Sequence, residues 1–189
     1  MKNQEIIVKD FRNENYQSVI DNLKQNINDN IAPVISSIEL IYVHWYIVLE
    51  VRKFPYNGKD LNEWGRELKH VYKTYSSPWM NDADFLFYTA YMGSSFCEAF
   101  IGLDRKDIYD MFGKAYEMYP DNILYQWGEF TRKFIEYKEQ GKELEWKEEN
   151  RRMARLVLAN DECVKSIKKY PLLGEDLLWL LDIQQKEEF

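Results

Sequence analysis

The chain has 189 residues, of which 46% are hydrophobic and 30% are charged, which is enough apolar material for a folded core and excludes a disordered tail. Its 8 glycines and 5 prolines are fewer than an average soluble protein carries, which favours helices over sandwiches, collagen or linkers. The net charge of −7 disfavours nucleic acid and anionic lipid as direct ligands, because both are polyanions.

Apolar residues recur at spacings of three and four along most of the chain, as amphipathic helices require. Only residues 5–8 are predicted to be extended. A first helix begins near Tyr16 and ends near Ile27. A second covers about residues 31–53 and is apolar on all sides, as a helix buried on several faces would be. A strand is the alternative for residues 38–51, since they are rich in β-branched and aromatic residues, but the segment is longer than usual strands.

A turn at residues 55–58 precedes a helix that Asp60 is placed to cap. The next helix opens at Asp82 or Asp84 and runs to about Phe100. It carries two apolar stripes and therefore needs two packing partners. The stripes consist of Phe85, Tyr88, Met92, Phe96 and Ala99, and of Phe87 and Tyr91.

Gly102 ends that helix, and Asp104 starts another. The inward positions of this helix are Ile108, Met111, Phe112, Ala115 and Tyr119. After Pro120, one helix is predicted through Trp127, Phe130, Phe134 and Tyr137. Beyond a break at Gly141 come a charged amphipathic helix and two short helices. The sequence thus predicts an all-α fold of about eight helices, arranged as stacked antiparallel hairpins or an irregular bundle, with residues 1–189 forming a single helical domain.

Three helix ends share a tyrosine followed closely by a proline, at Tyr75, Tyr119 and Tyr170. The tyrosines are 44 and 51 residues apart, a spacing consistent with stacked helical hairpins. Residues 102–122, GLDRKDIYDMFGKAYEMYPDN, resemble the second helix of a tetratricopeptide repeat. That family's packing positions match Ile108, Phe112 and Ala115, and Pro120 stands at the exit. The resemblance covers one half-repeat and implies a curved stack of helix pairs that binds a partner.

Glu63, Glu67 and His70 lie on one helix face, and Glu67 with His70 forms a Glu-x-x-His step of the kind used in carboxylate-bridged metal sites. Such sites need a second step, and His44 has Ile41 where the glutamate should stand. The expected arrangement at Glu67 is therefore a solvated helix face without metal. His44 itself is expected to be a buried, hydrogen-bonded histidine.

The sequence gives little support for cysteine chemistry, phosphate binding or membrane insertion. Cys97 and Cys163 are interpreted as small core residues that stay reduced, and no phosphate-cradling glycine loop is present. The longest apolar run, residues 40–51, is too short for a membrane helix, and the N-terminal residues lack a signal-peptide pattern. We therefore expect a soluble, cytoplasmic protein with no cofactor, no metal and no catalytic residue.

The acidity is concentrated in two segments. Residues 78–122 hold eight acids against three bases, and residues 171–189 hold five against one. In the first segment the carboxylates alternate with aromatic residues, a mixture that suits docking of a basic protein. A solvated face that merely keeps the chain soluble is the alternative. The predicted partner-binding residues are Trp79, Asp82, Asp84, Tyr88, Tyr91, Asp104, Asp107, Tyr109, Asp110 and Asp121.

The sequence thus favours a non-enzymatic protein-binding module that captures a basic protein. Its size and acidity are similar to those of immunity or antitoxin-type inhibitors, which neutralise a basic toxin domain such as a nuclease. One alternative is a tetratricopeptide-like scaffold or adaptor that holds an extended peptide. Another is an enzyme whose carboxylate or metal site is hidden among the 32 acids. The oligomeric state and the partner's identity are not encoded in any recognisable motif.

Overall fold

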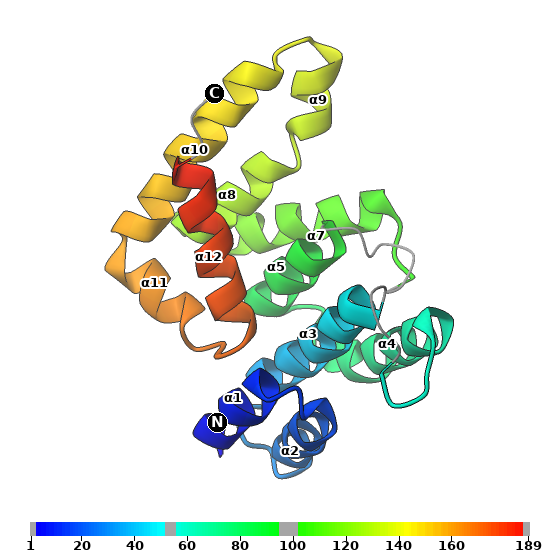
Figure 1. The fold of residues 1–189 in the computed structure, drawn as a ribbon. Coiled ribbons are helices and arrows are strands. Elements are labelled where there is room, and N and C mark those ends of the chain that lie inside the picture. Colours follow the sequence, from blue (N-terminus) through cyan, green and yellow to red (C-terminus); the bar gives the residue numbers. More distant parts are fainter. Residues whose placement is uncertain (1–2, 52–55, 95–101, 187–189) are drawn as a thin grey trace. The chain divides into compact units, whose positions relative to one another are not determined.

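A computed structural model describes residues 3–51, 56–94 and 102–186, and in these ranges the fold is all-α. The chain folds as two compact units, Met1–Ile108 and Tyr109–Phe189. The boundary falls within the helix of residues 105–118, which Figure 1 labels α7. The prediction of a single domain over 1–189 stays a prediction. The described part contains eleven α-helices, roughly in line with the expected number of about eight. They are α1 (Gln4–Arg12), α2 (Tyr16–Asn28), α3 (Pro33–Val51), α4 (Leu61–Ser76), α5 (Ala83–Met92), α7 (Arg105–Met118), α8 (Ile123–Thr131), α9 (Phe134–Glu139), α10 (Glu143–Ala159), α11 (Asp161–Ile167) and α12 (Leu173–Lys186).

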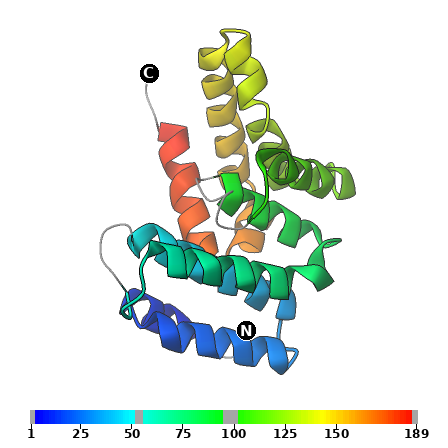
Figure 2. The same cartoon turned by 90° about the vertical axis from the view of Figure 1, so that its right-hand side faces the viewer.

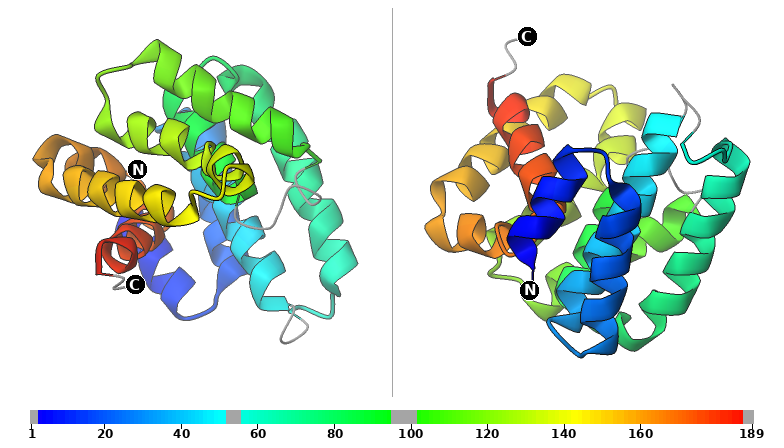
Figure 3. Two further views of the ribbon diagram at one scale, coloured as in Figure 1. Left: turned by 90° about the horizontal axis from the view of Figure 1, so that it is seen from above. Right: turned by 60° about the horizontal axis from the view of Figure 1, so that its bottom comes forward.

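The core of the first unit is built around α3. This helix contacts α2, α4 and α5 and lies between α2 and α4 (Figure 3). Because it has neighbours on several sides, apolar side chains all round its axis are buried, as predicted for a helix, and the strand alternative is excluded. Its fully buried apolar residues are Ile38, Leu40, Ile41, Val43, Ile47 and Val48.

The first helix corrects a prediction, because residues 5–8 are helical in α1 and not extended. The apolar run from Ile6 to Val8 is too short to distinguish a strand from a helix. Ile7 and Phe11 are four positions apart and share one face of α1. Ile7 is fully buried, and the ring of Phe11 lies 5.4 Å from that of Tyr16 and 4.9 Å from that of Tyr46.

Two helices begin directly after the aspartates that were expected to cap them. The Asp60 carboxylate accepts a hydrogen bond from the backbone N–H of Glu63 at 2.9 Å, and Asp82 accepts one from Phe85 at 2.8 Å. Asp60 therefore caps α4, and Asp82, not Asp84, caps α5. The helix predicted to reach Phe100 is described as far as Ser94, and the rest of that prediction, with Cys97, lies outside the described residues.

The second unit is organised around α10, which contacts α8, α9, α11 and α12. Figure 2 shows the red α12 beside the orange part of α10. The single helix predicted through residues 127–137 is two helices, α8 and α9. Phe130 and Phe134, on either side of the break, both pack on Trp146, with ring centroids 6.0 and 4.9 Å from the indole.

Tyr119 corrects another prediction, since its side chain is 57% exposed and does not point inward. The helix ends at Met118, so the register that buries Ile108, Phe112 and Ala115 does not extend to Tyr119. Tyr170, by contrast, is buried, so the three tyrosines at helix ends do not occupy equivalent environments. None of the described helices has both the length and the hydropathy needed to cross a membrane.

Candidate partner-binding surface

Two of the ten predicted contact residues are buried, so their assignment to a surface was wrong. Tyr88 is 0% exposed and Tyr91 is almost fully buried, because every residue of α5 except Asp84 is buried. The sequence held the signal for this: both tyrosines fall on the apolar stripes of that helix. Abundant tyrosine suggested a binding surface, but the helical register was the stronger indicator.

The remaining predicted residues of the first unit are at least partly accessible, and most also have a local structural role. Trp79 is half-buried and donates its indole N–H to the Ser37 hydroxyl at 3.2 Å. Asp82 and Asp84 are half-buried at the start of α5. Asp104 and Asp107 are exposed and exchange hydrogen bonds. The Asp107 N–H donates to Asp104 at 2.8 Å and the Asp104 N–H to Asp107 at 3.3 Å.

In the second unit, Tyr109 is half-buried, and Asp110 and Asp121 are exposed. Asp110 lies close enough to the Arg132 guanidinium to affect it. A hydrogen bond to Glu129, reinforced by Glu136 and Asp110, raises the pKa of Arg132. Asp110 is thus part of a mixed charged cluster with a net negative charge.

The C-terminal end of α7 presents a surface of which the sequence analysis predicted only Asp121. Met118 is 43% and Tyr119 is 57% exposed, and Glu117 and Asp121 beside them are exposed as well. Large apolar side chains and carboxylates therefore face solvent together here. The early end of the helix produces this arrangement, and Pro120 was the sequence signal for it. We call Glu117, Met118, Tyr119 and Asp121 the α7 corner.

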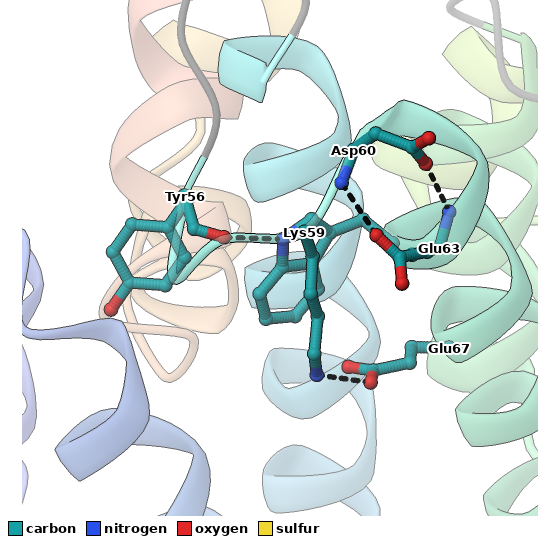
Figure 4. A network of polar contacts seen from close by, with 6 residues as sticks. Tyr56, Lys59, Asp60, Glu63 and Glu67 are labelled. Atoms are coloured by element: carbon teal, nitrogen blue, oxygen red, sulfur yellow. Dashed lines mark hydrogen bonds and ion pairs between the residues drawn. The ribbon is translucent and has the colours of Figure 1, made fainter.

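The glutamates singled out for a metal site are engaged in α4's own architecture. Glu63 completes the capping box by accepting the Asp60 N–H at 2.9 Å, and Glu67 forms an ion pair with Lys59, whose ammonium lies over the Trp64 ring (Figure 4). His70 is exposed. No group of three or more metal-ligating side chains occurs within residues 3–51, 56–94 and 102–186.

His44 is a buried histidine, as predicted. Its side chain is 3% exposed, and its Nδ1 lies 2.8 Å from the Leu40 carbonyl oxygen. A carbonyl only accepts, so Nδ1 carries the proton of the neutral ring. Burial lowers the pKa of His44 to about 4. A ring that is neutral and packed 6.1 Å from Trp64 has a structural role in the core.

Cys163 is buried at the start of α11, in agreement with its interpretation as a core residue. It borders a cavity of about 220 Å³ formed by the first turns of α8 and α11 together with Asp121. Burial raises the pKa of the Cys163 thiol, and the backbone N–H groups of Leu124 and Ile123 partly offset that effect. A thiol that stays protonated is a poor nucleophile.

Comparison with protein-family models, curated proteins and solved structures finds no match to this chain.

Proposed function

We propose that this chain is a protein-binding module that captures a basic protein, in the manner of an immunity or antitoxin-type inhibitor of a basic toxin domain. The observation that carries the proposal is the exposed side of α7. In the part of α7 that belongs to the second unit, Asp110 is exposed, and the α7 corner adds two carboxylates and two accessible apolar side chains at the end of the helix.

The difference between the buried and the exposed positions of α7 supports its proposed role in partner binding. Ile108, Met111, Phe112 and Ala115 are buried and fix the helix, while Asp110 and Glu117 face solvent. Exposed carboxylates speed the encounter with a basic protein, and accessible apolar groups slow the release of the complex. Tyr119 is suited to the second task, because a tyrosine buries a large area and has few rotamers to freeze.

The test uses the full chain, immobilised, to capture a polypeptide from extracts of its native cell. The captured protein is identified by intact mass and purified, and its Kd is measured. We expect a partner of basic isoelectric point. The variant Asp110→Lys with Glu117→Lys should weaken binding about tenfold, because reversing two exposed charges slows the electrostatically guided encounter with a basic partner.

The matched control is Glu139→Lys with Glu148→Lys, which changes the net charge equally at exposed positions of α9 and α10. It should bind like the wild type. Equal loss in both double variants would show that only net charge matters, and failure to capture any basic polypeptide would refute the proposal.

The alternative hypothesis, a tetratricopeptide-like adaptor, predicts a different result for the same complex. A groove in stacked hairpins would bind a short synthetic segment of the partner as tightly as the whole protein. An inhibitor covers a large interface and needs the folded partner. Equal affinity of segment and intact partner would favour the adaptor.

A further inference from the structure

The turn before α4 contains the one Asn-Gly step in the sequence, Asn57 followed by Gly58. Both residues are exposed, and both have positive φ angles, of 50° and 70°. The Lys59 N–H donates to the Tyr56 carbonyl oxygen at 3.1 Å, and the same two residues form an isolated antiparallel bridge. Asn57 and Gly58 are therefore the central residues of a tight turn of the type I′ kind, which the Asn-Gly pair favours.

Contacts with α4 hold this turn closed. The Trp64 indole N–H donates to the Tyr56 carbonyl oxygen at 3.1 Å, beside the bond from Lys59. Lys59 forms an ion pair with Glu67, and its ammonium lies 4.7 Å from the centroid of the Trp64 ring (Figure 4). The two ends of the turn are thus fixed, while its central residues project into solvent.

The tip of the turn brings an amide side chain next to a backbone nitrogen with little steric protection. Gly58 has no Cβ, and within the described part of the chain only its own chain neighbours lie near the place where a Cβ would stand. The bond that closes the turn uses the N–H of Lys59 and not that of Gly58. Water and hydroxide therefore have access to the Gly58 nitrogen and to the Asn57 amide.

We propose that Asn57 is a site of spontaneous deamidation, and that the contacts which close the turn set the rate of the reaction. The proposal concerns covalent chemistry of the chain itself, so it goes beyond the proposed function and does not depend on it.

The reaction consumes only water. Hydroxide removes the proton from the Gly58 nitrogen, and that nitrogen forms a bond to Cγ of Asn57, which closes a succinimide ring. The bond from Cγ to Nδ2 breaks, and Nδ2 leaves as ammonia after taking a proton from water. A water molecule then opens the ring at Cγ to give aspartate, or at the backbone carbonyl to give isoaspartate. Either product carries one more negative charge, and isoaspartate also lengthens the main chain by a methylene within the turn.

The closed turn restrains this reaction. The first central residue of a type I′ turn has a ψ angle of about +30°, whereas the succinimide ring requires the Gly58 nitrogen to lie nearly in line with Cβ of Asn57. Ring closure therefore requires rotation about the Asn57 Cα–C bond, which opens the turn. The rate should follow the population of the locally opened state, and the contacts that close the turn lower that population.

The experiment incubates the folded full chain in mildly alkaline buffer and follows the masses of its tryptic peptides with time. Trypsin releases residues 54–59, which contain Asn57, and residues 60–66, which contain Asn62, as separate peptides. Asn62 is an exposed asparagine within α4 and serves as the internal control. We expect the first peptide to become about 1 Da heavier and to separate into aspartate and isoaspartate forms, while the second stays unchanged.

Three variants test the chemistry and the role of the turn. Asn57→Gln should abolish the mass gain, because glutamine forms its larger ring far more slowly. Glu67→Gln removes the partner of Lys59 and should raise the rate by up to about fivefold, as expected for the loss of an exposed ion pair. The matched control is Glu162→Gln, which breaks the exposed ion pair with Lys165 in the second unit and should leave the rate unchanged.

Two results would overturn the proposal. If the peptide of residues 54–59 gains mass no faster than the peptide of residues 60–66, Asn57 is not a deamidation site. If the rate is the same in the wild type and in Glu67→Gln, or the same in the folded chain and in urea, the turn does not control the reaction. Circular dichroism checks that Glu67→Gln keeps its helices, so that a faster rate reports on the turn and not on unfolding.

Discussion

His44 makes the first unit sensitive to acid by an amount that the structure allows to be calculated. Its pKa is about 4 in the folded chain and 6.5 for an ordinary histidine, and burial is the main cause of the difference. The groups that act on its charge are Lys24, Lys59 and Glu67. Protonating the ring places a positive charge in a region from which water is largely excluded.

The sign follows from proton binding. Between pH 6.5 and pH 4 the unfolded chain binds a proton at this histidine more readily than the folded chain does, so acidification favours unfolding. Above pH 6.5 neither state is protonated there and the effect vanishes. The difference between the two pKa values corresponds to about 3 kcal/mol of folding free energy, lost progressively as the pH falls through this window.

The assay is urea unfolding of the wild type and of His44→Gln at a series of pH values between about 7.5 and 4, which brackets the window. Carboxylates titrate in both proteins, so the difference between them isolates the histidine. The wild type should lose about 3 kcal/mol more than the variant across the window. His70→Gln removes an exposed histidine and serves as the control. Parallel pH curves for the wild type and His44→Gln would refute the reasoning.

Three further predictions concern the stability of the second unit. A Cβ added at Gly174 would lie 2.3 Å from the Ile167 carbonyl oxygen, so Gly174→Ala should destabilise the chain by about 1–3 kcal/mol. At Gly113 an added Cβ would meet only the Glu129 carboxylate, at an ordinary contact distance of 3.7 Å. Gly113→Ala should therefore stabilise α7 by about 0.5–1 kcal/mol. Thermal unfolding that finds Gly174→Ala more stable than Gly113→Ala would contradict both predictions. Asn150 accepts the Trp127 indole N–H at 3.1 Å in a buried site, so Asn150→Leu should cost about 1–3 kcal/mol in urea unfolding, and a neutral effect would show that the bond contributes nothing.

Predictions based on the helical periodicity and on the capping residues were the most reliable ones. They predicted α2, the burial of α3 on several sides, and the starts of α4 and α5, because each depends on neighbours a few positions away. The ends of helices were harder to predict. Whether α8 continues into α9, and whether Tyr119 stays in register with α7, depends on contacts that are distant in sequence, such as those of Phe130 and Phe134 with Trp146.

The candidate surface was predicted less well than the fold, for the same physical reason. Composition identified an acidic, aromatic segment, but exposure is set by tertiary packing. Tyr88 is buried because α5 is covered almost all round, whereas Tyr119 is exposed because its helix has ended.

The most direct test of the central claim is the association rate constant of the captured basic partner as a function of ionic strength. Encounter guided by the exposed carboxylates of α7 predicts a rate that falls steeply as salt is added. In Asp110→Lys with Glu117→Lys the rate should be lower and its salt dependence shallower, while the dissociation rate changes less. A rate that is independent of salt in the wild type, or equally steep in the variant, would contradict the role assigned to this helix.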